Sequence, residues 1–155
     1  MAVDHLERSL EQLFRLYSSR KVHSRLAAAA GTVVSQPGAA LLRRLDEHGP
    51  LTLGELATLT QMDPSATGRQ VKQLVVDGLV ARAQNVEDGR STVVRLTQRG
   101  AAVRRRFTKV GHQHLEDALA GWSKADRAAL ADLLARLVDD LRSIHYRELN
   151  EAAAG

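Results

Sequence analysis

The chain has 155 residues, of which 44% are hydrophobic and 26% charged, the balance expected of a single globular domain over residues 1–155. Lysine and arginine number 22 against 18 acidic residues, so the formal net charge of +4 favours an anionic partner without requiring one. Cysteine is absent, which excludes disulfides, thiolate zinc sites, catalytic thiols and thiol-based redox sensing.

We expect neither a secretory signal nor a membrane segment. Residues 1–10 contain acidic side chains and no apolar signal core. The longest uncharged stretch, residues 26–42, is interrupted by Gly31 and Pro37 before it could span a bilayer. The sequence therefore predicts a cytoplasmic protein with no membrane partner.

Long amphipathic helices are predicted at both ends of the chain. Apolar residues recur at three- and four-residue spacing over residues 3–17 and again over residues 130–144. A third helix is predicted from about residue 98 to residue 121. The middle of the chain is too short to cover three apolar stripes, so we expect segments 1–30 and 101–150 to be dimerisation helices of a homodimer.

Two short helices joined by a tight turn are predicted in the middle of the chain. Thr52 and Glu55 fit a capping box, which begins the first helix. Asp63 before Pro64 begins the second helix, which ends at Gly78. Such a pair is a helix-turn-helix.

A β-hairpin is predicted directly after these helices. Residues 79–82 and 92–96 are β-prone, and Asp88-Gly89 between them is a turn signal. Helix, turn, helix and hairpin in this order form a winged helix, here over residues 38–100. The expected fold is mainly α with a small β-hairpin wing: a winged helix-turn-helix with long N- and C-terminal dimerisation helices.

The second helix of the pair has the composition of a helix that reads the DNA major groove. Ser65 and Thr67 can donate to phosphates or base edges, Arg69 can pair with guanine, and Gln70 can pair with adenine. The solvated face of any amphipathic helix has a similar composition, so the helix alone leaves both interpretations open. The candidate DNA-contacting residues on this helix are Ser65, Thr67, Gly68, Arg69, Gln70 and Lys72.

The hairpin favours the DNA-binding interpretation. Its tip carries Arg90 beside Asp88. An arginine on a protruding turn can enter the minor groove, and a neighbouring carboxylate can hold its guanidinium in position. Asp88 and Arg90 complete the predicted DNA-contacting set.

Four short segments together carry a family resemblance: Pro64-Ser65-Ala66-Thr67-x-Arg69, Asp77-Gly78-Leu79-Val80, Asp88-Gly89-Arg90-Ser91 and Leu96-Thr97-x-x-Gly100. With the flanking helices, they resemble the MarR family of bacterial transcription regulators over nearly the whole chain. The resemblance implies a dimeric winged-helix protein that binds a roughly palindromic operator. It places the helix from Asp63 in the major groove and Arg90 in the minor groove, with release by a small ligand or an oxidant.

The chain departs from the family pattern at Gly68, where the family usually has a larger polar residue, commonly threonine. A glycine inside a helix costs about 1 kcal/mol relative to alanine. Gly68 therefore either lets the backbone approach DNA closely or weakens the helix.

The absence of cysteine has a consequence for sensing, because the oxidation-sensing members of the family use that residue. Any sensing by this chain would therefore occur by binding a small-molecule effector. Tyr17, His23 and Trp122 are candidates to line the pocket, although core packing accounts for Tyr17 and Trp122 equally well.

No catalytic or cofactor-binding arrangement is recognisable in the sequence, so we predict neither an enzyme nor a cofactor. His112 and His114 are two residues apart on a predicted helix and face different directions, which is poor spacing for one metal ion. No metal site is predicted, and a sensor combining one of them with Glu116 or Asp117 is the alternative.

The sequence predicts a transcriptional regulator that binds specific double-stranded DNA. In this interpretation it is a homodimeric repressor of a palindromic operator, released by a small molecule and not by thiol oxidation. The alternative is a winged-helix module without an effector, which binds DNA non-specifically or mediates protein contacts. The two differ in the sequence and salt dependence of DNA binding.

Overall fold

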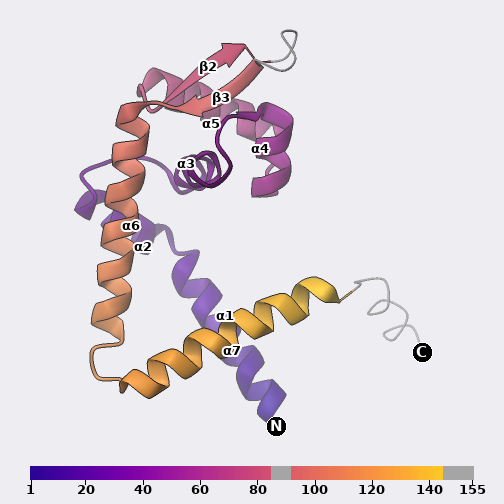
Figure 1. Cartoon of the computed structure of the whole chain (residues 1–155), viewed down its shortest axis with the longest axis vertical. Coiled ribbons are helices and arrows are strands. Elements are labelled where there is room, and N and C mark those ends of the chain that lie inside the picture. Colours follow the sequence, from indigo (N-terminus) through magenta and orange to yellow (C-terminus); the bar gives the residue numbers. More distant parts are fainter. Residues whose placement is uncertain (85–91, 145–155) are drawn as a thin grey trace. The chain divides into compact units, whose positions relative to one another are not determined.

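The computed structural model of the chain describes residues 1–84 and 92–144 (Figure 1). The chain consists of two compact units, Met1–Gln113 and His114–Gly155. The first unit contains α1 (Ala2–Tyr17), α2 (Arg20–Ala29), α3 (Gln36–His48), β1 (Leu51–Thr52), α4 (Leu53–Thr60), α5 (Pro64–Val76), β2 (Val80–Gln84), β3 (Thr92–Leu96) and most of α6 (Gln98–Ala118). The second contains the end of α6 and α7 (Lys124–Ser143). The predicted winged helix-turn-helix is confirmed.

Side-chain caps begin both helices of the helix-turn-helix, as the sequence predicts. Thr52 Oγ1 accepts a hydrogen bond from the Glu55 amide at 3.3 Å, and the Glu55 carboxylate accepts one from the Thr52 amide at 2.7 Å. This backbone bond, together with one from the Thr52 hydroxyl, holds the pKa of Glu55 below its usual value. Asp63 caps α5 by accepting from the Ala66 amide at 3.0 Å.

The turn between the two helices depends on a residue that the sequence pattern does not reveal. Gln61 ends α4 in the left-handed conformation, with φ of 53°. This conformation is uncommon for residues other than glycine, asparagine and aspartate. It turns the chain sharply enough for Asp63 to begin α5 two residues later.

The sheet has three antiparallel strands in the order β1-β3-β2. β2 and β3 form the predicted hairpin ladder, paired from Val80 with Leu96 to Gln84 with Thr92. The two-residue strand β1, which was not predicted, pairs Leu51 with Val94. α3, α4 and α5 pack together against this sheet (Figure 1).

One apolar core holds the winged helix together. Leu41 and Leu42 of α3 and Leu56 of α4 are fully buried, and Val71 and Leu74 of α5 are nearly so. Burying each such side chain stabilises the fold by about 1.5–3 kcal/mol. The inner side of α5 is therefore fixed on α3 and α4.

Thr97 and Gly100 join the sheet to α6. Thr97 Oγ1 donates to the carbonyl oxygen of Gly78 at 2.7 Å and accepts from the Gly100 amide at 3.0 Å. A Cβ atom on Gly100 would overlap the carbonyl oxygen of Leu79. This close approach explains why the Leu-Thr-x-x-Gly segment ends in glycine.

Gly100→Ala should lower the free energy of unfolding by about 1–3 kcal/mol, because the new methyl group overlaps a backbone carbonyl. Gly111 is the matched control, since a Cβ there on the same helix meets nothing within 4 Å. Gly111→Ala should stabilise the protein by up to about 1 kcal/mol through helix propensity. Urea unfolding measures both values, and equal effects would contradict the predicted close approach.

Two helices at the ends of the chain carry apolar side chains that the structure leaves exposed. Neither α1 nor α7 contains a buried residue. Phe14 on α1 is 74% exposed and Leu133 on α7 is 63% exposed. Across the parts of the chain that the structure describes, no helix is long and apolar enough to cross a membrane.

Candidate nucleic-acid interface

An exposed polar face runs along α5. Ser65, Arg69 and Lys72 are exposed and lie at i, i+4 and i+7, so they share one side of the helix. Val71 and Leu74 lie on the opposite side, in the core. Because the core holds the inner side, the outer side presents two cations and a hydroxyl in a fixed orientation.

The charges on this face are available to an anionic partner. Neither Arg69 nor Lys72 forms an ion pair with any residue that the structure describes. Ser65 lies in the first turn of α5, where the helix dipole favours negative charge. The N-terminal half of the face thus has the chemistry that phosphate oxygens and base edges require.

Thr67 does not belong to this face, and the prediction that its side chain contacts DNA is wrong. The residue is fully buried, with 0% of its surface exposed. Its hydroxyl donates to the carbonyl oxygen of Asp63 at 3.0 Å, which satisfies the buried oxygen within the same helix. Thr67 therefore packs α5 onto the core.

Gln70 is turned toward α3. Its Oε1 atom accepts a hydrogen bond from Ser35 Oγ at 2.9 Å, and the residue is half-buried. The pairing of Gln70 with adenine stays a prediction. Ser35 was not among the predicted site residues, and its one sequence signal is that it precedes Gln36-Pro37, as a helix cap does.

Gly68 lies at the edge of the exposed face and is half-buried. A Cβ atom there would meet one described neighbour, Leu53 Cδ2 at 3.8 Å, which is an ordinary van der Waals contact. Packing within the protein therefore does not require glycine at this position. The proposed contacts Asp88 and Arg90 at the wing tip lie outside the described residues.

Two of the cavities in the first unit are lined in part by His23. The first, which we name the His23 cavity, has a volume of about 380 Å³ and is lined by residues that include Tyr17, His23, Arg43, Arg104 and Phe107. The second, the Gln70 cavity, has a volume of about 630 Å³ and is lined by residues that include Arg20, His23, Ser35, Gln36 and Gln70. Tyr17 and His23 thus meet at one cavity, whereas Trp122 lies in the second unit and is exposed.

His23 is held in place by two contacts. Its Nε2 atom forms a hydrogen bond with the carbonyl oxygen of Val34 at 2.8 Å. Its ring stacks on that of Phe107, with 5.8 Å between the ring centroids. The imidazole therefore links α2 to the segment before α3 and to α6.

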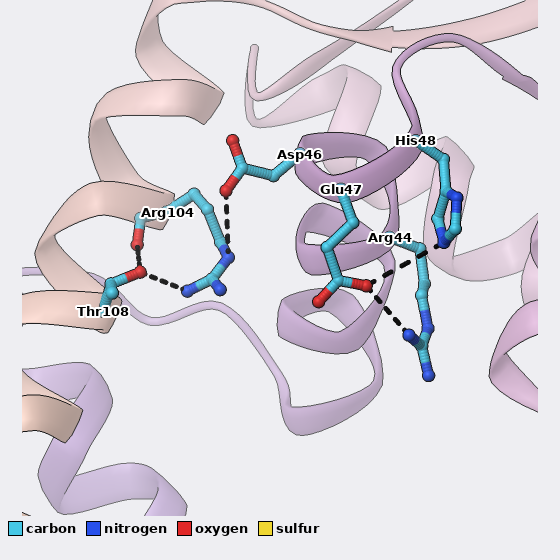
Figure 2. A network of polar contacts seen from close by, with 6 residues as sticks. All are labelled: Arg44, Asp46, Glu47, His48, Arg104 and Thr108. Atoms are coloured by element: carbon cyan, nitrogen blue, oxygen red, sulfur yellow. Dashed lines mark hydrogen bonds and ion pairs between the residues drawn. The ribbon is translucent and has the colours of Figure 1, made fainter.

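Arg104 on α6 contacts Asp46 on α3, as Figure 2 shows. Its Nε atom lies 3.6 Å from the Asp46 carboxylate, and its Nη1 atom donates to Thr108 at 2.6 Å. On α3 itself, Glu47 accepts from Arg44 at 2.8 Å. Arg104 lines the His23 cavity, and its ion pair with Asp46 holds it beside α3.

The candidate metal ligands are not brought together. Within residues 1–84 and 92–144, no group of three or more His, Cys, Asp or Glu side chains could hold a metal ion. His112 and His114 are both exposed on α6, two residues apart. Among the described residues, the exposed face of α5 and the two cavities thus offer hydrogen-bonding groups and positive charge.

Comparison with known proteins identifies the family. The family model "MarR family" matches residues 34–92, from two residues before α3 to the first residue of β3. An uncharacterised HTH-type transcriptional regulator of Bacillus subtilis, YdgJ, is 31% identical over 134 residues, which are 86% of this chain and 81% of that protein. The chain belongs to the MarR family. It is a transcriptional regulator with a DNA-binding winged helix.

Solved structures of related proteins have the same fold. RV1404 from Mycobacterium tuberculosis is 29% identical, with a TM-score of 0.75 over 94% of this chain and 97% of that one. The PcaV transcriptional regulator of Streptomyces coelicolor, solved in complex with its natural ligand, is 26% identical. Its TM-score is 0.56, over 88% of this chain and 91% of that one.

Gly68→Ala tests whether the backbone of α5 must approach DNA closely. The free energy of unfolding should rise by about 1 kcal/mol in the variant, because alanine favours the helix and the site has room for a methyl group. Thermal unfolding measures this stability, and fluorescence anisotropy measures DNA affinity. Unchanged DNA affinity would exclude the need for close approach, whereas weaker binding by a more stable protein would support it.

Proposed function

We propose that this protein is a homodimeric repressor that binds a palindromic operator and is released from it by a small molecule. The observation that carries the proposal is the exposed face of α5, on which Ser65, Arg69 and Lys72 lie together without acidic partners among the described residues. The helix is rigidly mounted, because its other face is buried in the core. A rigid cationic helix on a winged-helix scaffold suits the major groove.

Each residue of the face has a separate role in this proposal. Arg69 can donate two parallel hydrogen bonds to the O6 and N7 atoms of a guanine. Lys72 and Ser65 contact phosphates, which set the register of the helix on the duplex. Asp88 and Arg90 are proposed as the minor-groove contact of the wing, with Asp88 orienting the arginine.

The exposed apolar faces of α1 and α7 support a homodimer. On α7, Leu134, Val138 and Leu141 lie at i, i+4 and i+7 and are all exposed. A second copy of the chain would cover such stripes, with segments 1–30 and 101–150 forming the interface. Two winged helices related by a two-fold axis would then meet two half-sites, about 34–36 Å apart for each helical turn of DNA.

The His23 cavity is the proposed effector site. Arg43 at its wall has no acidic partner among the described residues and favours a small organic anion, whereas Arg104 shares its charge with Asp46. Tyr17 and Phe107 supply aromatic surface. The PcaV structure shows that a related protein of the same fold binds a natural ligand. An effector here would contact α3 and α6 together, since Arg104 already links these helices through Asp46.

Arg69→Ala and Lys72→Ala should have different effects on DNA binding. Losing Arg69 should cost about 1–3 kcal/mol and relax the preference at one base position, because a base contact is lost. Losing Lys72 should weaken binding to all sequences and reduce the salt slope by about one. Selection from random duplexes gives the base preferences, and titrations at several salt concentrations give the slopes.

Arg136→Ala is the control, because this arginine is exposed on α7, outside the winged helix. The DNA affinity of Arg136→Ala should match that of the parent protein. If Arg69→Ala weakens binding equally on every duplex, the protein coats DNA without specificity. If neither variant changes affinity, the exposed face of α5 is not the DNA contact.

Leu141→Asp should convert the dimer to a monomer, because it places a charge within the apolar stripe of α7. Ala128→Asp is the matched control, since this exposed residue lies about 140° around the helix from Leu141, on the polar side of α7. Analytical ultracentrifugation gives the mass of each. A parent protein that sediments as a monomer would rule out the dimer, and an unchanged mass for Leu141→Asp would exclude α7 from the interface.

A further inference from the structure

One hydroxyl group serves both α3 and α5. Ser35 is the N-cap of α3, and its Oγ atom accepts a hydrogen bond from the Gly38 amide at 3.1 Å. The same Oγ donates its proton to Oε1 of Gln70 at 2.9 Å. The start of α3 is therefore bonded to the middle of α5, although the two residues are 35 positions apart.

A second contact lies one turn further along both helices. Gly38 is buried, and a Cβ atom on it would lie 3.4 Å from Leu74 Cδ2 and 3.0 Å from Val34 Cγ1. The tight neighbours of such a Cβ are Val34 and Ser35, just before α3, whereas Leu74 Cδ2 is at ordinary van der Waals distance, so α3 packs on α5 here without an unusually close approach. Gln70 and Leu74 are four residues apart on α5, so both contacts join the same flank of this helix to α3.

The side of α5 that carries Gln70 is not the side that carries Arg69. Successive residues of a helix are rotated by about 100°, so Gln70 lies between the exposed face and the buried one. It is half-buried, whereas Arg69 and Lys72 are exposed. Because Gln70 is hydrogen-bonded to Ser35 from this flank, it restrains α5 from the side.

We infer that Gln70 is a positioning residue: the core fixes which side of α5 faces outward, and the hydrogen bond of Gln70 with Ser35 limits the remaining rotation at which Arg69 and Lys72 meet DNA. The inference rests on the proposed role of α5 in the major groove. According to this inference, Ser35 affects DNA affinity although it lies outside the exposed face of α5. The inference also reassigns Gln70, which by composition alone is a candidate for pairing with adenine.

A double-mutant cycle on DNA affinity tests the inference. Ser35→Gly removes the hydroxyl while keeping a residue that helix N-caps tolerate, and Gln70→Leu removes the acceptor. Each should weaken operator binding by about three- to fivefold, the size of one neutral hydrogen bond. The double variant should bind no more weakly than the weaker single variant, because both changes break the same bond.

Base preference and rescue separate positioning from other roles. In selections from random duplexes, Gln70→Leu should relax preference only at the base position that Arg69→Ala relaxes, and Ser35→Thr, which keeps the hydroxyl, should bind like the parent protein. A relaxed preference at a different base position in Gln70→Leu would identify Gln70 as a base contact and overturn the inference. The inference would also be overturned if the affinity losses of the two single variants multiply in the double variant. Unchanged DNA affinity in Ser35→Gly would overturn it as well.

Hydrogen exchange of the free protein tests the same bond without DNA. The amides of α5 should exchange about three- to fivefold faster in Ser35→Gly and in Gln70→Leu, and Ser35→Thr should match the parent. If the parent fails to bind DNA but this pattern holds, the proposed function fails while the restraint on α5 stands. If exchange in α5 is the same in all variants, the bond does not hold the helix and the inference fails.

Discussion

The burial of the inner side of α5 is the constraint on which the rest of the winged helix depends. Val71 and Leu74 lie in the core with α3 and α4, and Thr67 completes this side by satisfying its hydroxyl within its own helix. Because the inner side of the helix is held in the core, the residues on its outer side are the ones that face solvent. The cationic character of the outer side is useful to a DNA-binding protein because the core orients it.

Local chemistry explains why much of the fold could be predicted from the sequence. The capping box of Thr52 and Glu55, and the start of α5 at Asp63 and Pro64, depend on residues a few positions apart, and the structure contains both. The β2–β3 ladder follows in the same way from two β-prone runs around a turn signal. Ser65, Arg69 and Lys72 also lie together, because helical periodicity alone places them on one side.

Features that depend on tertiary packing could not be predicted in this way. Composition groups Thr67 with its polar neighbours, and only the position of the core shows that it is buried. The bond between Ser35 and Gln70 joins two elements distant in sequence, and neither residue is unusual for a helix of its kind. Strand β1 has two residues and exists because β3 offers Val94 as a partner to Leu51.

The shared hydroxyl of Ser35 has a consequence for how binding in the Gln70 cavity would act on the protein. A hydroxyl group has one proton and two lone pairs, and here α5 receives the proton while α3 uses a lone pair. Ser35 and Gln70 both line that cavity. An occupant that accepts the proton would break the bond to α5 and leave the cap of α3 intact, so α5 would lose this restraint while the core beneath it stayed folded.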